Sequence, residues 1–178
     1  MNQINIQTAG LPTAWAKACS QAVEALNKEF AAKGVAVRLV VNKKEKISIP
    51  IKTDANLAGT AISGSTHAAF TDERKPVFVS AEVKLPVAPQ INTPGGVRTA
   101  GAGVLIAIVA HEIVHALGHV EHARAEIEPH NTHLMTATMR SLPGDTPAED
   151  KLIGADGARL PPILLSAQSI DVLKLIWN

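Results

Sequence analysis

Residues 104–118 read VLIAIVAHEIVHALG, an apolar run that leads into two histidines and a glutamate. From Val104 to Ala110 every side chain is apolar, so a helix formed here would bury all of its faces in the middle of the domain. Gly118 suits the left-handed conformation that ends a helix and turns the chain back. The stretch therefore predicts a central buried helix over 103–117 with polar groups near its C-terminal end.

The spacing of those polar groups favours a metal site. His111 and His115 stand four residues apart, so on a helix their rings project from one face at a separation that suits a single Zn²⁺. Glu112 is rotated by about 100° from His111 around the helix axis and could reach a metal-activated water without binding the metal. Because a buried helix would be destabilised by unsatisfied polar groups, we predict Zn²⁺ as cofactor, His111 and His115 as ligands, and Glu112 as the catalytic general base.

The segment HEIVHALGH resembles the HExxHxxG core of the metzincin zinc metallopeptidases, and the matrixin-like branch is closest. In that family a third histidine follows three residues after the glycine, and a methionine in a tight turn lies beneath the metal. Met135, within HNTHLMTATM, resembles the residue of that methionine turn. The resemblance implies a metalloprotease, a hydrolase that cleaves peptide bonds with an extended peptide or protein substrate laid along an edge strand of the sheet.

Other segments extend the resemblance over most of the chain. The order of TPGGVRTAGAGV, HEIVHALG, TPAEDK and PPILLSAQSIDVLKLIW resembles that of matrixin-like peptidases encoded in bacteriophage genomes. This similarity implies a metzincin-like fold and a phage-associated protease. Latency through the cysteine of a preceding pro-segment is not expected.

The sequence departs from the family at the third ligand. The family position falls on Glu121 instead of a histidine, and His119 and His122 stand on either side of it. We predict His122 as the third ligand, because a loop longer by one residue is easily accommodated at a surface turn and a third imidazole suits zinc. Glu121 remains an alternative, since carboxylates also bind zinc, and His119 is the remaining one.

A second departure concerns the oxyanion. The chain contains no tyrosine, whereas many metzincins place one just after the methionine turn to stabilise the developing negative charge. If that role exists here, another hydrogen-bond donor fills it. The nearby candidates are His130, His133 and Arg140.

Two further helices are expected at the two ends of the chain. The apolar positions of the first recur every three or four residues, at Trp15, Ala18, Cys19, Ala22, Leu26 and Phe30. This spacing predicts a helix over 12–33 that ends at Gly34 and buries Cys19 as an inert thiol. The second begins at Ser166, a good N-cap, and places Ile170, Leu173 and Trp177 on one packed face.

Strands are expected between the helices. Residues 35–41 and 76–85 alternate between apolar and polar, 57–63 is a weaker candidate, and 64–66 is typical of a turn. Residues 86–103 are rich in proline and glycine without a period, which predicts a loop. We therefore expect a mixed α/β (α+β) fold with a twisted mixed sheet.

In this fold the sheet backs onto the first helix and the buried central helix. Residues 1–178 are expected to form one domain, with an upper part over about 1–118 and a smaller lower part over about 119–178 that ends in the C-terminal helix. The 46% share of apolar residues is enough for a core that needs no disulfides.

Composition excludes several other classes of protein. Seventeen basic and sixteen acidic residues leave a net charge of +1, and the one dense basic stretch, residues 43–46, is expected to be a solvated turn and not a nucleic-acid site. A single cysteine, Cys19, forbids a cysteine metal cage. His67 is expected at or near the surface. Neither a signal peptide nor a membrane span is predicted, so we expect a soluble protein made in the cytoplasm, either phage-associated or released by a non-Sec route.

Two rival functions stay open from the residues alone. A degenerate metzincin-like protein could keep zinc to hold its shape and bind a peptide or a partner protein. The missing tyrosine and the displaced third ligand favour that reading, and Glu112 argues against it, because a structural metal site has no use for a general base. Alternatively the same chemistry could cleave the stem peptides of a cell-wall polymer.

Overall fold

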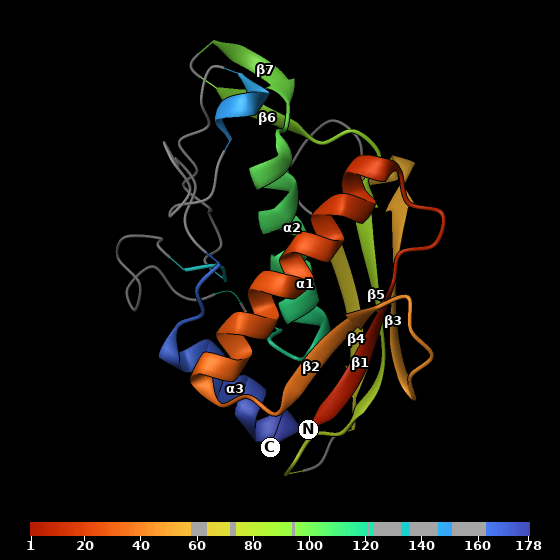
Figure 1. Ribbon diagram of the computed structural model, residues 1–178, viewed down its shortest axis with the longest axis vertical. Helices are drawn as coiled ribbons and strands as arrows, with labels where there is room; N and C mark the ends of the chain where they lie inside the picture. The colour runs from red at the N-terminus through yellow and green to blue at the C-terminus, as the bar shows by residue number, and fades with distance from the viewer. Residues whose placement is uncertain are drawn as a thin grey trace.

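In the computed structural model the described residues form a five-stranded sheet with the strand order β2-β1-β3-β5-β4, and three α-helices accompany it (Figure 1). The strands are β1 (Asn2–Gln7), β2 (Val37–Val41), β3 (Ile47–Asp54), β4 (Ser65–Phe70) and β5 (Phe78–Pro86). The helices are α1 (Thr13–Lys33), α2 (Ala102–Ala116) and α3 (Ala167–Trp177). The structure describes residues 1–57, 64–71, 74–93, 95–120, 122, 133–135, 146–150 and 163–178. The predicted mixed α/β class is confirmed.

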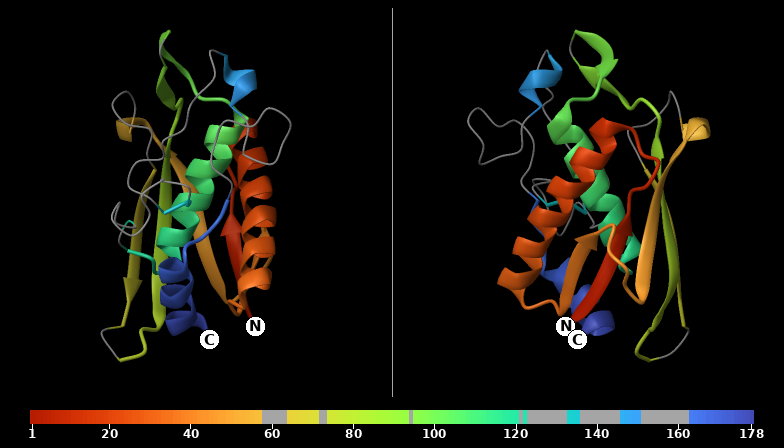
Figure 2. Two further views of the ribbon diagram at one scale, coloured as in Figure 1. Left: turned by 90° about the vertical axis from the view of Figure 1, so that its left-hand side faces the viewer. Right: turned by 45° about the vertical axis from the view of Figure 1, so that its right-hand side comes forward.

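Strand direction distinguishes β4 from the other four. β1 runs parallel to β2 and β3, β3 runs parallel to β5, and β4 runs antiparallel to β5 at the edge of the sheet. The helices α1 and α2 both lie against one face of this sheet (Figures 1 and 2). The described strands therefore form a mixed sheet whose edge strand β4 is antiparallel to its neighbour.

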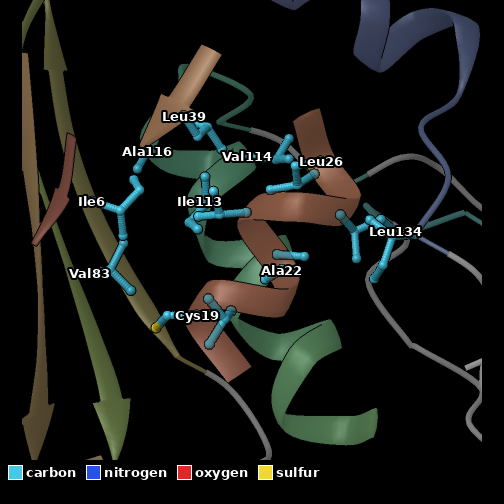
Figure 3. Packing of buried hydrophobic residues seen from close by; sticks show 14 of the residues in the cluster. Ile6, Cys19, Ala22, Leu26, Leu39, Val83, Ile113, Val114, Ala116 and Leu134 are labelled. Carbon is cyan, nitrogen blue, oxygen red and sulfur yellow. The ribbon is translucent and has the colours of Figure 1, made fainter. Parts of the chain in front are cut away.

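The two faces of the sheet differ in chemistry because successive side chains in a strand point to opposite sides. Ile6, Leu39 and Val83 face the helices and are buried in the core that α1, α2 and the sheet share (Figure 3). On the other face, Lys52 Nζ lies 2.6 Å from Glu82 Oε2 across β3 and β5. The helices therefore cover an apolar face, and the opposite face carries surface ion pairs.

Helix α1 follows the predicted boundaries closely. It begins after Pro12 and ends at Gly34, whose φ of 70° is the left-handed conformation that glycine adopts without strain. Cys19 is fully buried between α1 and the sheet (Figure 3), and burial raises the pKa of its thiol to about 12. The expectation of an inert core thiol is confirmed, because so little thiolate forms near neutral pH.

The central helix α2 is buried over nearly its whole length, as its sequence predicts. The predicted range 103–117 is displaced by one residue from the observed one. Gly118, with a φ of 111°, turns the chain away from the helix as expected. Its Cα lies so close to α3 and β4 that an added Cβ would overlap Ile176 and crowd Phe70.

The N-terminal end of α2 is held by a residue from far along the chain. Asp150 accepts a hydrogen bond of 2.7 Å from the backbone N–H of Gly101 and forms an ion pair with Arg98, in which Nη2 lies 2.6 Å from Oδ1. The carboxylate of Asp150 is fully buried. The ion pair of Asp150 and Arg98 therefore takes the place of the water that, at the end of a surface helix, accepts hydrogen bonds from the free N–H groups. Arg98 belongs to a hairpin formed by β6 (Gln90–Thr93) and β7 (Gly96–Thr99).

That hairpin corrects the expectation of a loop over 86–103. Its strands are only four residues long and lack a clear alternation, and the glycine Gly96, with a φ of 113°, supplies the turn geometry. Residues 64–66 are also misassigned as a turn, because Ser65 and Thr66 begin the edge strand β4. Small and polar residues can occupy an edge strand, where only one side pairs.

Two central strands were not predicted. In β1 only Ile4 and Ile6 are apolar, and β3 contains Pro50, a residue that argues against a central strand. Pro50 is tolerated because it stands where β3 changes its partner: Ile47–Pro50 pair with β1, and Ile51 onward pair with β5. Of the predicted strand 57–63, Leu57 ends a 3₁₀ helix and residues 58–63 lie outside the described part of the chain.

The remaining expectations concern the C-terminus and the surface. Ser166 is the N-cap of α3, and its Oγ accepts a hydrogen bond from the backbone N–H of Ser169, as predicted. The basic residues 43, 44 and 46 are exposed, and so is His67. Most of the predicted lower part, 119–178, lies outside the described residues. No helix among the described residues combines the length and apolar character that a membrane span requires.

A substitution of Gly118, the glycine that ends α2, tests how much the close packing at this turn contributes to stability. Gly118→Ala should lower the free energy of unfolding by about 2–4 kcal/mol, since it adds both a strained backbone conformation and an overlap with Ile176. Gly10→Ala is the matched control, because Gly10 also has a positive φ, of 82°, but has open space around its Cα. The control should lose only about 1 kcal/mol. Equal losses in urea unfolding would show that packing against Gly118 contributes nothing.

Candidate metal centre

Three histidine rings converge at the C-terminal end of α2. His111 and His115 project from one face of the helix, and His122 comes from the chain beyond the Gly118 turn. The Nε2 atoms of His111 and His115 lie 3.0 Å apart, and that of His122 lies 3.1 Å and 3.3 Å from them. Within the described part of the chain, this is the one group of three or more potential ligand residues that could hold a metal ion.

The triangle of nitrogens has the dimensions of one face of a metal tetrahedron. Two nitrogens bound to zinc at ~2.0–2.1 Å with a tetrahedral angle lie about 3.3 Å apart. The three observed separations, 3.0–3.3 Å, are at or just below this value. The donor set therefore fits a single small metal ion.

Backbone carbonyls determine which ring nitrogens face the centre. Nδ1 of His111 donates to the carbonyl oxygen of Leu134 at 2.7 Å, and Nδ1 of His115 donates to that of His119 at 2.5 Å. Because a carbonyl only accepts, each Nδ1 carries the proton and each Nε2 presents a lone pair. Two lone pairs 3.0 Å apart repel each other, and a bound cation removes that repulsion.

Burial keeps the rings neutral. It lowers the pKa of His111 from 6.5 to about 4, against the opposing effect of the hydrogen bond to Leu134, with the neighbouring histidines lowering it further. Burial likewise lowers the pKa of His115 and His122. Neutral imidazole is the form that binds metal, so the rings need not lose a proton near neutral pH.

Glu112 lies next to this group but takes no part in it. Its side chain is only 5% exposed, and Thr66 Oγ1 lies 2.5 Å from its Oε2 and 3.1 Å from its backbone oxygen. Gly64 leaves the space for the Glu112 side chain, since an added Cβ there would overlap it. Burial raises the pKa of Glu112, while the hydrogen bond from Thr66 and the charge of His122 lower it.

Thr66 and Gly64 were not among the residues singled out from the sequence. Both precede Glu112 by more than 40 positions, in a segment whose sequence is typical of a turn. Nothing in the local pattern connects a threonine on an edge strand to Glu112. The contact arises only because α2 packs beside β4.

Other candidates are placed differently. The ring of His119 forms a hydrogen bond of 3.0 Å with Ser169 Oγ, away from the histidine triangle, although its carbonyl contacts His115. Met135 is buried in a turn, and its neighbour Leu134 supplies the carbonyl that binds His111. His133, at the same turn, is half-buried. Three further candidates lie outside the described residues: Glu121, His130 and Arg140.

No model of a protein family and no curated protein matches the chain. The chemistry of the site therefore rests on its own geometry.

The depressed pKa values predict how the metal-free protein responds to acid. An unfolded His111 binds its proton near pH 6.5, and the folded one near pH 4. Between these values the unfolded chain binds a proton that the folded chain does not, so the free energy of unfolding should fall as the pH is lowered from 6.5 to 4. His111 alone should contribute on the order of 3 kcal/mol.

Urea unfolding of chelator-treated protein at a series of pH values measures this effect. His111→Gln is the control, because glutamine keeps a polar side chain that does not titrate, and its stability should depend less on pH across the same range. A parent stability that is unchanged between pH 6.5 and 4 would contradict the buried, neutral state of the ring.

Proposed function

We propose that the protein is a zinc-dependent endopeptidase of the metzincin type. The observation that carries the proposal is the triangle of Nε2 atoms, 3.0–3.3 Å apart, beside a buried glutamate on the same helix. His111, His115 and His122 would hold the metal. Three protein ligands are typical of catalytic zinc sites, whereas structural zinc sites have four.

Zinc suits this donor set better than harder cations. Three neutral imidazoles attract Mg²⁺ and Ca²⁺ weakly, because those ions prefer oxygen ligands. A zinc ion held there would act as a Lewis acid: it would polarise a substrate carbonyl and lower the pKa of a water molecule toward ~7. The buried surroundings strengthen this electrostatic effect.

Glu112 is suited to act as the general base. Its carboxylate is adjacent in sequence to the ligand His111 and is held by the hydroxyl of Thr66 at 2.5 Å. Burial raises the pKa of Glu112, and a raised pKa makes its carboxylate a better proton acceptor near neutral pH. A group in this position accepts a proton from the attacking water and later donates it to the leaving amine.

The edge strand β4 supports a peptide as substrate. β4 pairs with β5 on one side, and no described strand pairs with its other side. An extended peptide could add to such an edge through backbone hydrogen bonds. Thr66, which contacts Glu112, lies on this same strand, so a peptide bound along β4 would pass close to the base.

Metal binding should depend on His122 far more than on its neighbour. His122→Ala should weaken zinc binding by about 100-fold or more, because it removes one of three ligands. Glu121→Ala is the matched control at the preceding position and should bind zinc nearly as tightly as the parent. Competition with a chromophoric chelator measures both, and a larger loss for Glu121→Ala would move the third ligand to that residue.

Hydrolysis should depend on Glu112 without a loss of metal. Glu112→Gln keeps the size of the side chain and a partner for Thr66 but cannot accept the proton, so the rate should fall by about 10²–10⁴-fold at unchanged zinc content. Denatured proteins and cell-wall stem peptides are both suitable substrates, and the preferred class separates protein cleavage from cell-wall cleavage.

Two outcomes would contradict the proposal. If the parent and Glu112→Gln cleave a substrate equally fast, Glu112 is not the base. If the zinc-loaded parent cleaves nothing across neutral pH, a zinc protein that binds a peptide or partner explains the site better.

A further inference from the structure

The C-terminal helix α3 holds the turn that separates two of the histidines. In Figures 1 and 2, α3 lies beside the C-terminal end of α2, although more than 40 residues separate them in sequence. It contacts three successive turn residues. Trp177 Nε1 donates to the carbonyl oxygen of Leu117 at 2.8 Å, Ile176 packs against Gly118, and Ser169 Oγ lies 3.0 Å from His119 Nε2.

His119 connects α3 to the metal centre through two different groups. Its carbonyl oxygen accepts the hydrogen bond from Nδ1 of His115, and its ring binds Ser169. The carbonyl direction depends on the orientation of the peptide unit after His119, and the ring bond restrains that residue. Two hydrogen bonds, both made by His119, therefore connect the hydroxyl of Ser169 to the ring of His115.

We infer that Ser169 acts, through His119, as a positioning residue for the ring of His115. This inference rests on the proposed function, since it supposes that His115 binds the metal. The carbonyl of His119 determines which nitrogen of His115 carries the proton and how far the ring can rotate. Ser169 then determines where that carbonyl lies.

The burial of the pair argues for a directional role. His119 is 4% exposed and Ser169 is 0% exposed, so both polar groups have been removed from water. Apolar side chains of similar size would fill the same space without that desolvation cost. A hydrogen bond between buried groups instead specifies one orientation, which a packed apolar pair would not.

Ser169 is itself rigidly held. Its backbone N–H donates to Ser166 Oγ, and the two hydroxyl oxygens are 3.1 Å apart. The residue thus lies in the capped first turn of α3, where fraying is suppressed. The cap holds the backbone of Ser169, while the hydroxyl of Ser169 itself makes the bond to the ring of His119.

Paired serine substitutions test the inference. Ser169→Ala removes the bond to His119 and should weaken zinc binding about tenfold, as loss of a partner of a metal-ligating histidine does. Ser166→Ala removes a hydroxyl from the same cap but leaves Ser169 to bind His119, so it should lower thermal stability while keeping the zinc affinity within about threefold of the parent. Chelator competition on folded protein measures both affinities.

A second pair at His119 distinguishes positioning from packing. His119→Gln retains an amide nitrogen near the place of Nε2 and should recover most of the affinity, whereas His119→Leu should behave like Ser169→Ala. The visible spectrum of the Co²⁺-loaded protein should shift in Ser169→Ala and His119→Leu and stay unchanged in His119→Gln, because it reports ligand geometry directly. If Ser169→Ala does not fold, the His119 pair decides alone.

The results separate this inference from the function on which it depends. A parent that binds neither zinc nor Co²⁺ contradicts the proposed function. A parent that binds zinc, with Ser169→Ala and His119→Leu binding equally tightly and giving the parental Co²⁺ spectrum, overturns the inference and leaves the function standing. Equal losses in Ser169→Ala and Ser166→Ala would also overturn it, since they would show only an effect of helix stability.

Discussion

The candidate metal centre depends on two hydrogen bonds that join histidine rings to backbone carbonyls. Nδ1 of His111 donates to Leu134, and Nδ1 of His115 donates to His119. Since a carbonyl cannot donate, these bonds orient both rings and leave their Nε2 lone pairs facing one another. Neither carbonyl belongs to α2, so the geometry of the site depends on chain segments that lie outside the helix carrying the ligands.

Tertiary packing holds both carbonyls in place. Leu134 is buried near α1 (Figure 3), and its N–H donates to Leu164 at 2.8 Å, while the next residue, Leu165, donates to the buried Glu29 of α1 at 3.1 Å. His119 is held by α3 through Ser169. The segment that leads into α3 therefore connects α1 to Leu134. Helix α3 itself contacts His119 through Ser169. Both carbonyls are therefore held by contacts with the C-terminal part of the chain.

A buried helix also requires that its free backbone groups find partners. Gly101, which precedes α2, has no side chain that could cap the helix, and Asp150 fulfils this role from a distant segment. Arg98 balances the charge that this brings into the interior. At the other end, Gly118 turns the chain sharply enough for His119 and His122 to return to the helix. Burial near α2 therefore lowers the pKa of the histidine rings. It also requires a capping group from a distant segment and a glycine at the turn that follows the helix.

The sequence by itself determined the features that depend on local geometry. Four-residue spacing places His111 and His115 on one face of a helix, glycine ends that helix, and periodic apolar residues mark α1 and α3. Only the tertiary structure placed the ring of His122 in the triangle and that of His119 outside it, because the ring of His119 forms a hydrogen bond with Ser169 of α3, 50 positions later. It likewise decided that Thr66 binds Glu112 and that Pro50 is tolerated in a central strand. Helical spacing acts over a few residues and is readable from sequence, whereas these choices depend on which distant elements pack together.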